Sequence, residues 1–257
     1  MSTAARGLRH LGRRVRERFY GAFDCQTHII ALHDYSLLYY AVPKVANTSL
    51  KEMFGELVAA RLPQDFRERL SEGGRGASLF SKDRRPAMYE RNILLCKHHV
   101  RHFDGYTGVA FVRNPWDRLV SCYANKLNRR HLFQGPERRG TLKSLQAAGL
   151  YSAEMSFADF VRAVGIIPDS EANRHFRSQY TFLTDRRGSL MPQRIYRFEK
   201  LDEDLSALIS DFGLPRMELP HKKSTSRRDY REYYTPELRD MVAQRYADDI
   251  ELFDYEF

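Results

Sequence analysis

Apolar residues along the chain predict strands that alternate with helices. Short apolar runs typical of buried strands occur at residues 35–42, 92–96, 108–112 and 193–198. Helical spacing of apolar residues predicts helices at 49–61, 115–123, 157–164, 175–183, 201–212 and 236–253. This alternation predicts an α/β fold, a three-layer sandwich around a central, mostly parallel sheet. Ligands of such sheets bind beyond the carboxyl ends of the strands.

The first stretch with candidate chemistry is VPKVANTSLK, residues 42–51, between a predicted strand and a predicted helix. The start of a helix offers backbone N–H donors and the positive end of its dipole, so it favours anions. Lys44 adds a positive charge, and Thr48 and Ser49 add hydroxyl donors. Ser49 and Glu52 also fit a capping box, so a capped helix with an exposed lysine is the alternative. The stretch lacks the glycines of a Walker A loop, which argues against a nucleoside triphosphate kinase.

The second stretch is FVRNPWDRLVSCY, residues 111–123, and it has the same strand-to-helix setting. Arg113 ends the strand, where its guanidinium can hold a phosphate with two donors. Asn114 can cap the helix that Pro115 opens. Ser121 lies two turns into that helix and can reach the same anion as Arg113, whereas Arg118 is expected to pair with Asp117 or another acid. The alternative is a surface arginine and a serine bonded to its own helix.

Composition fits a folded protein with anionic partners. Of the 257 residues, 42% are hydrophobic and 29% are charged, which is typical of a globular chain. The net charge of +9 favours nucleotides, nucleic acids, acidic glycans or a membrane surface as partners. A nucleic-acid-binding protein is the main alternative from another class, but no nucleic-acid motif is present. Three cysteines without metal-site spacing indicate a reducing compartment and predict no bound metal.

The sequence divides into a basic N-terminal extension, residues 1–30, and a main domain, residues 31–257. The extension is rich in arginine and could contact a membrane surface, bind a polyanion or act as a transit segment. A plain basic helix or tail is the simpler interpretation. No stretch is long and apolar enough to span a membrane.

Together, PKVANTSLK and RNPWDRLVSCY resemble the two nucleotide-binding segments of the carbohydrate sulfotransferase family that includes soluble bacterial relatives. The resemblance covers roughly residues 35–257 and includes RIYRFEKLDEDL near the C-terminus. It implies a fold related to P-loop nucleotide kinases. It also implies transfer of a sulfuryl group from 3'-phosphoadenylyl sulfate (PAPS) to a hydroxyl of a carbohydrate or glycolipid, without a metal. An inactive PAPS-binding protein is a further alternative.

The resemblance also implies roles for particular residues. Lys44 would contact the phosphosulfate, and Arg113 and Ser121 would hold the 3'-phosphate. The rest of the phosphosulfate cradle would be Val45, Ala46, Asn47, Thr48 and Ser49. Asn47 departs from the small residue or cysteine that relatives often carry, which affects the shape of the loop and not its charge.

A base is needed to accept the proton of the acceptor hydroxyl, and histidine suits this role near neutral pH. His99 resembles the catalytic histidine of the uronyl 2-O-sulfotransferase branch, with His98 as the second candidate. If the strand continues through them, these two side chains point to opposite faces. The alternative is a packed histidine, with the base elsewhere.

Two further features bear on the partners. His175 and Gln179 match a segment near the acceptor pocket of relatives, with ordinary helix surface as the alternative. A basic run near the C-terminus could close over the nucleotide, bind an acidic acceptor or remain a solvated loop; it consists of Lys222, Lys223, Arg227 and Arg228. The lack of a membrane span favours a cytoplasmic bacterial enzyme, with peripheral contact at the inner membrane through the basic N-terminus. The sequence does not indicate an oligomeric state.

Overall fold

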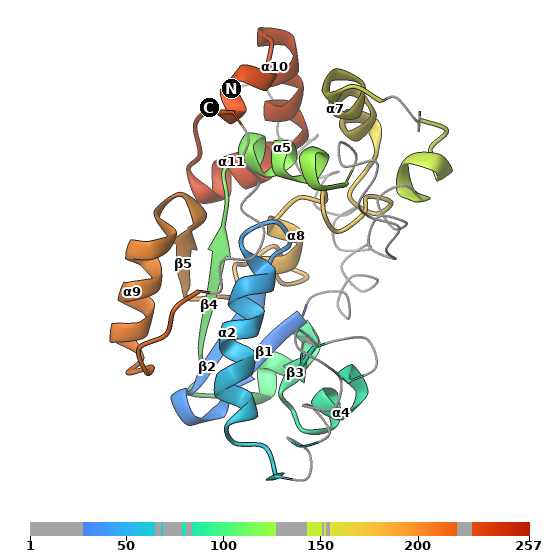
Figure 1. Cartoon of the computed structure of the whole chain (residues 1–257). Coiled ribbons are helices and arrows are strands. Elements are labelled where there is room, and N and C mark those ends of the chain that lie inside the picture. Colours follow the sequence, from blue (N-terminus) through green and yellow to red (C-terminus); the bar gives the residue numbers. More distant parts are fainter. Residues whose placement is uncertain are drawn as a thin grey trace. The chain divides into compact units, whose positions relative to one another are not determined.

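The computed structural model describes the chain in two compact units (Figure 1). The described residues are 28–64, 68, 79–80, 84–126, 143–150, 152, 155–219 and 228–257. Unit 1 takes in residues 1–42, 46–111 and 182–222, and unit 2 takes in residues 43–45, 112–181 and 223–257. Most of the basic N-terminal extension lies outside the described residues, as do Lys222, Lys223 and Arg227 of the basic run.

A five-stranded sheet in the order β3-β1-β2-β4-β5 forms the centre of unit 1. Its strands are β1 (His28–Leu32), β2 (Leu37–Ala41), β3 (Leu94–Leu95), β4 (Thr107–Val112) and β5 (Arg194–Arg197). β2 is parallel to β4, but β1 is antiparallel to both β2 and β3. The sheet is therefore mixed, and the prediction of a mostly parallel sheet was wrong. The three-residue η2 joins β1 to β2, and so short a link can connect only antiparallel neighbours.

The apolar-run pattern located four of these strands and missed β1. β1 begins at His28, inside the segment assigned to the basic extension. All five of its residues are buried. The folded part of the chain therefore begins earlier than residue 31, where we expected the main domain to start.

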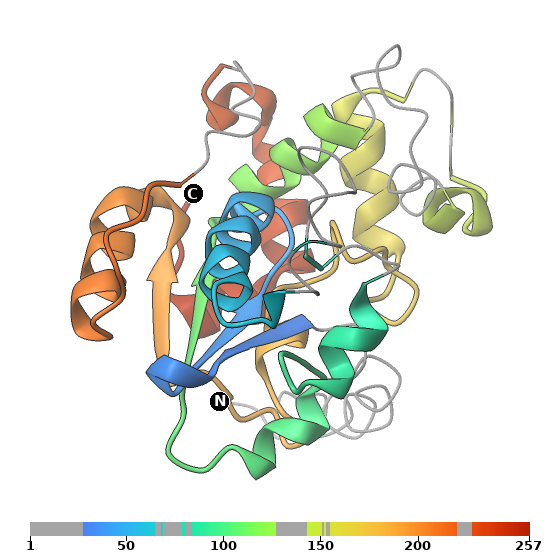
Figure 2. The same cartoon turned by 60° about the horizontal axis from the view of Figure 1, so that its bottom comes forward.

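Helices cover the sheet of unit 1. They are η2 (His33–Tyr35), α2 (Asn47–Ala59), α4 (Arg85–Glu90), η3 (Lys97–His102), η4 (Phe198–Lys200) and α9 (Leu201–Asp211). Figure 2 shows α2 lying across the strands and α9 alongside β5. Tyr39 of β2 packs against Phe54 of α2 with ring centroids 4.7 Å apart, and both side chains are fully buried. This packing fixes the direction in which α2 leaves the end of β2.

Unit 2 is helical. Its helices are α5 (Pro115–Lys126), α7 (Phe157–Ile166), η5 (Tyr230–Tyr233), α10 (Pro236–Arg245) and α11 (Ala247–Phe253). The short α8 (Tyr180–Leu183) begins in unit 2 and ends in unit 1. The core of unit 2 contains Phe160, Phe176 and Tyr246, each at most 1% exposed. Tyr246 leaves helical geometry, so the single helix predicted at 236–253 is two helices, α10 and α11.

Candidate functional site

The loop between β2 and α2 has an unusual backbone. Lys44 and Ala46 have φ angles of 74° and 54°, in the left-handed region. Residues with a side chain pay roughly 1–2 kcal/mol for this conformation, and a glycine would avoid most of that cost. Strained backbone of this kind is concentrated at functional sites. The loop thus makes, without glycine, a sharp turn for which phosphate-binding loops commonly use glycine.

Helix α2 begins at Asn47, two residues earlier than the sequence pattern suggested. Its N-cap is Ala46, and no side chain caps the first turn. The capping box expected from Ser49 and Glu52 was therefore wrong, because Ser49 lies inside the first turn. In an uncapped helix, the first backbone N–H groups have no partner within the helix and point beyond its N-terminus. These donors and the dipole make this end of α2 attractive to an anion.

In unit 2, Arg113 follows the end of β4 and is held on two sides. Its Nε and Nη2 atoms both donate to Oδ2 of Asp117, each at 2.7 Å. Its Nη1 atom donates to the carbonyl oxygen of Lys44 at 3.1 Å. The side chain is 8% exposed. Lys44 and Arg113, which come from the two separate sequence motifs, are therefore direct neighbours within unit 2.

The start of α5 supports this arrangement. Asn114 Oδ1 accepts hydrogen bonds from the backbone N–H groups of Trp116 and Asp117, at 3.1 and 3.4 Å. The predicted cap at Asn114 and the helix opening at Pro115 are confirmed. Asp117 and Ser121 are four residues apart on α5, so they share a face of the helix. Ser121 is 7% exposed and lies on the same side of α5 as the acid that holds Arg113.

Arg118 is a buried residue whose side chain donates to backbone carbonyl groups. It is 2% exposed, and its guanidinium donates to the carbonyl oxygens of Pro43, Arg177 and Arg174 at 3.0, 2.8 and 3.4 Å. The expected ion pair with Asp117 was wrong, because Asp117 pairs with Arg113 instead. Burial lowers the pKa of Arg118. Arg118 fastens the loop at Pro43 to α5.

Gln179 and His175, the two residues expected near an acceptor, lie in different surroundings. Gln179 is fully buried. Its Oε1 accepts from the N–H of Arg113 at 2.9 Å, and its Nε2 donates to the carbonyl oxygen of Arg113 at 2.8 Å. His175 is partly buried, with Nδ1 2.6 Å from Oδ1 of Asn173. Gln179 therefore contacts the backbone of Arg113 rather than an open pocket.

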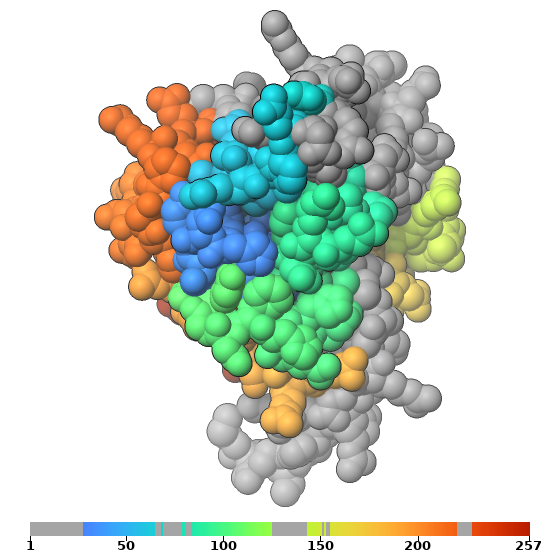
Figure 3. Space-filling view, turned by 90° about the horizontal axis from the view of Figure 1, so that it is seen from below, coloured from blue at the N-terminus to red at the C-terminus, as the bar shows by residue number. Residues whose placement is uncertain are grey.

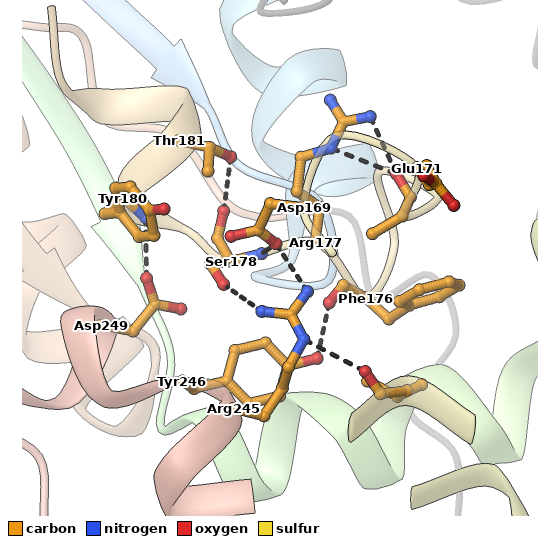
Figure 4. A network of polar contacts seen from close by, with 12 residues as sticks. Asp169, Glu171, Phe176, Arg177, Ser178, Tyr180, Thr181, Arg245, Tyr246 and Asp249 are labelled. Carbon is orange, nitrogen blue, oxygen red and sulfur yellow. Dashed lines mark hydrogen bonds and ion pairs between the residues drawn. The ribbon is translucent and has the colours of Figure 1, made fainter. Parts of the chain in front are cut away.

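Polar contacts continue from this glutamine to Asp249, and Figure 4 shows Asp249 beside Tyr180. Asp249 Oδ2 accepts from the N–H of Gln179 at 2.8 Å, and its Oδ1 accepts from the N–H of Tyr180 at 2.8 Å. Burial raises the pKa of Asp249 to about 6, although the charge of Arg118 and both N–H donors oppose the shift. The sequence offered no local signal for Asp249, which lies 70 residues from Gln179.

A partly buried acid, Asp169, pairs with Arg245 at 2.7 Å in the same unit. Burial disfavours its ionised form, but the charge of Arg245 and hydrogen bonds from Ser178 hold its pKa below the ordinary value. Figure 4 shows Arg245 reaching both Asp169 and Ser178. These contacts anchor the segment that leads to Gln179.

In unit 1, His98 and His99 lie on the 3-10 helix η3 and both are exposed. Their ring centroids are 3.9 Å apart, with the ring planes tilted by 58°. The expectation that they point to opposite faces was wrong, because β3 ends at Leu95 and the chain turns into η3 before the histidines. The neighbouring Lys97 is buried and donates to the carbonyl oxygen of Thr184 at 2.9 Å.

A cavity near η2 lies elsewhere in unit 1. It has a volume of about 180 Å³ and is lined by η2, the C-terminal end of α2 and Arg91. Figure 3 shows this side of the unit, with η2 in blue between α2 in cyan and α4 in teal. The cavity adjoins η2, which comes before the first residue of β2, whereas the strained loop comes after its last residue. The cavity therefore lies at the other end of this strand.

Comparison with known proteins identifies the family. The profile of the sulfotransferase family matches residues 27–256 of the chain. The chain belongs to the sulfotransferase family. Family membership supports sulfotransfer activity in general, and this sulfotransferase has two motifs that meet at the contact between Arg113 and Lys44.

One relative is "Carbohydrate sulfotransferase 14" from Danio rerio. It is 25% identical to the sulfotransferase over 197 residues, which cover 74% of this chain and 49% of the relative. The chain therefore spans about half the length of that relative. No solved structure is significantly similar to this chain.

The expected location was wrong. We expected a cytoplasmic bacterial enzyme, but the relative that matches is a carbohydrate sulfotransferase from Danio rerio. Among the residues that the structure describes, no helix has the length and apolar character to cross a membrane. The same residues contain no group of three or more His, Cys, Asp or Glu side chains placed to hold a metal ion.

Proposed function

We propose that this sulfotransferase moves a sulfuryl group from PAPS to a hydroxyl of a carbohydrate or glycolipid acceptor. The observation that carries the proposal is the hydrogen bond from Arg113 Nη1 to the Lys44 carbonyl oxygen. It joins two sequence motifs that are 69 residues apart. PAPS carries a phosphate group at its 3' position and a phosphosulfate at its 5' position. Its binding therefore needs two positively charged side chains that lie close together, as Lys44 and Arg113 would provide.

The loop from Lys44 to Ser49 would hold the 5'-phosphosulfate. The left-handed backbone at Lys44 and Ala46 and the uncapped first turn of α2 both support this role. The hydroxyl groups of Thr48 and Ser49 lie in that first turn, where they would add donors. Backbone N–H groups that are already oriented stabilise an anion without reorganisation during the reaction.

Arg113 and Ser121 would hold the 3'-phosphate. Asp117 binds the Nε and Nη2 atoms of Arg113 and thereby fixes the orientation of the guanidinium. A fixed guanidinium loses less conformational entropy when it binds a phosphate than a free one. Asp117 is therefore a positioning residue in this proposal.

The donor supplies the sulfuryl group, and the residues of the chain supply charge and proton transfer. As the acceptor oxygen forms its bond to sulfur, the bond from sulfur to the bridging oxygen breaks, and negative charge gathers on that oxygen. The ammonium of Lys44 would neutralise this charge. His99 would accept the proton of the acceptor hydroxyl. The products are the sulfated acceptor and adenosine 3',5'-bisphosphate.

We further propose that the fold is related to that of P-loop nucleotide kinases. The parallel pair β2 and β4 and the strand-to-helix turns that follow both strands support this relationship. In folds of this kind, ligands bind at the carboxyl ends of neighbouring parallel strands.

The protein is expected to bind adenosine 3',5'-bisphosphate at least roughly 100-fold more tightly than AMP, because charge-assisted hydrogen bonds each contribute about 1.5–3 kcal/mol. The two nucleotides differ only in the 3'-phosphate, so titration calorimetry with both isolates the contribution of Arg113 and Ser121. The Ser121→Ala variant should lower the ratio of the affinity for adenosine 3',5'-bisphosphate to the affinity for AMP. Equal affinities for the two nucleotides would contradict the proposed donor site.

The His99→Ala variant is expected to lower kcat by about 100-fold, the usual contribution of a general base. His98 is the matched control, because it is the adjacent histidine on the same exposed 3-10 helix. The rate of the His98→Ala variant should fall less than about tenfold, since it retains the proposed base. Labelled PAPS and a panel of glycans and glycolipids provide the assay. Equal losses in both variants, or none, would remove His99 from the mechanism.

A further inference from the structure

Gln179 makes an unusual contact with Arg113. Its side-chain amide bonds both the N–H and the carbonyl group of the same residue, at 2.9 and 2.8 Å. A neighbouring strand in a sheet makes this pair of bonds with its backbone. Gln179 thus continues the pairing of the chain one residue beyond the end of β4 at Val112.

Asp249 fixes which way this amide faces. An ionised carboxylate can only accept hydrogen bonds. Asp249 Oδ2 accepts from the backbone N–H of Gln179 at 2.8 Å and lies 3.5 Å from the side-chain Nε2 of the same residue. The amino side of the amide therefore faces Asp249, and its oxygen is directed at the N–H of Arg113. Because Gln179 and Asp249 are both fully buried, water does not compete for these bonds.

We infer that Gln179, oriented by Asp249, is a positioning residue that sets the direction of the Arg113 side chain toward the 3'-phosphate of the donor. This inference rests on the proposed function. Asp117 fixes the guanidinium of Arg113, and Gln179 fixes its backbone, so both ends of the residue are held before a nucleotide binds. A small displacement of the Arg113 guanidinium would sharply reduce its contribution to binding of the 3'-phosphate, so both ends of the residue need to be held in place.

The test compares affinities for adenosine 3',5'-bisphosphate and AMP, because their ratio reports only the contact with the 3'-phosphate. The Gln179→Met variant keeps the size of the side chain and removes both bonds to Arg113. The ratio should fall about tenfold or more, while AMP affinity changes less than about twofold. The matched control is Tyr246→Phe, which removes a buried hydrogen bond to the carbonyl oxygen of Phe176 in the same unit without touching Arg113. Its ratio should equal that of the natural protein.

The Gln179→Glu variant gives a readout that a merely structural role would not move. At alkaline pH, where both the introduced carboxyl group and Asp249 are ionised, the introduced side chain cannot donate to the Arg113 carbonyl, so the ratio should be low. At lower pH the protonated carboxyl regains a donor, and the ratio should rise relative to the natural protein at the same pH. The new carboxyl group lies beside Asp249, whose pKa is about 6 in the natural protein, so the two acids titrate as a coupled pair in the variant. Arg118, Arg245 and Asp169 also act on this pair or its neighbours, and the natural protein is therefore measured over the same pH range.

The outcomes separate the two claims. If the natural protein has no preference for adenosine 3',5'-bisphosphate, the proposed function fails. If it has the preference and a folded Gln179→Met variant keeps it, the positioning role of Gln179 is overturned. Should Gln179→Met not fold, a pH-independent ratio in Gln179→Glu overturns that role instead.

Discussion

The Lys44→Ala variant is expected to lower kcat for sulfuryl transfer by about 1,000-fold, because it removes the charge proposed to stabilise the leaving oxygen. The affinity for adenosine 3',5'-bisphosphate should fall less than about tenfold, since the 3'-phosphate contacts remain. The backbone of the loop should also remain, because Arg113 binds the carbonyl oxygen of Lys44 and not its side chain. Steady-state transfer from labelled PAPS measures the loss of kcat, and calorimetry measures the affinity.

Lys200→Ala is the control for that experiment. Lys200 is an exposed lysine on η4, and its removal changes the net charge of the protein by the same amount. Its kcat should stay within about twofold of the natural value, as is usual for surface substitutions. Lys44→Arg should recover only part of the activity, because a planar guanidinium cannot follow the leaving oxygen as an ammonium can. A Lys44→Ala variant with a kcat close to that of the natural protein would exclude Lys44 from catalysis.

The sequence allowed the candidate residues of both turns to be named because their signals are local. Pro115 and Asn114 mark the start of α5, and the buried strand before Arg113 locates that arginine at a strand end. Such signals depend on residues within one turn of one another. The neighbouring position of Lys44 and Arg113 follows from the parallel pairing of β2 and β4, since Lys44 is three residues after the end of β2 and Arg113 comes directly after β4.

The supporting residues could not be found in this way. Gln179 lies 66 residues from Arg113, and Asp249 lies a further 70 residues along the chain. Asp249 belongs to no motif, and the sequence placed Gln179 near an acceptor pocket and not beside Arg113. A buried amide or acid looks like a surface residue in the sequence. Only the fold shows that Gln179 binds the backbone of Arg113 and that Asp249 binds Gln179.

Two local predictions failed for a different physical reason. The capping box at Ser49 assumed that a serine starts the helix, but strained backbone at Ala46 starts it earlier. The opposite orientation of His98 and His99 assumed a continuing strand, but β3 has only two residues. In both places the backbone departs from the regular structure on which sequence patterns depend.

Arg118→Met is expected to lower the free energy of unfolding by about 3–5 kcal/mol, as when a buried charged residue is removed from its partners. Methionine matches the length of the apolar part of arginine but donates no hydrogen bond. The substitution leaves the carbonyl oxygens of Pro43, Arg177 and Arg174 without their donor. It also removes a positive charge that favours the ionised form of the buried Asp249.

Urea denaturation measures this loss, with Arg162→Met as the control. Arg162 is 52% exposed, and its ion pairs to Asp159 and Glu237 have distances of 3.7 and 3.9 Å. Exposed pairs of this kind contribute about 0.2–1 kcal/mol, so the control should stay close to the natural protein. Arg118→Lys should be nearly as unstable as Arg118→Met, because one ammonium cannot reach three carbonyl groups in different directions. If Arg118→Met is as stable as the control, the loop at Pro43 does not depend on this residue for its attachment to α5.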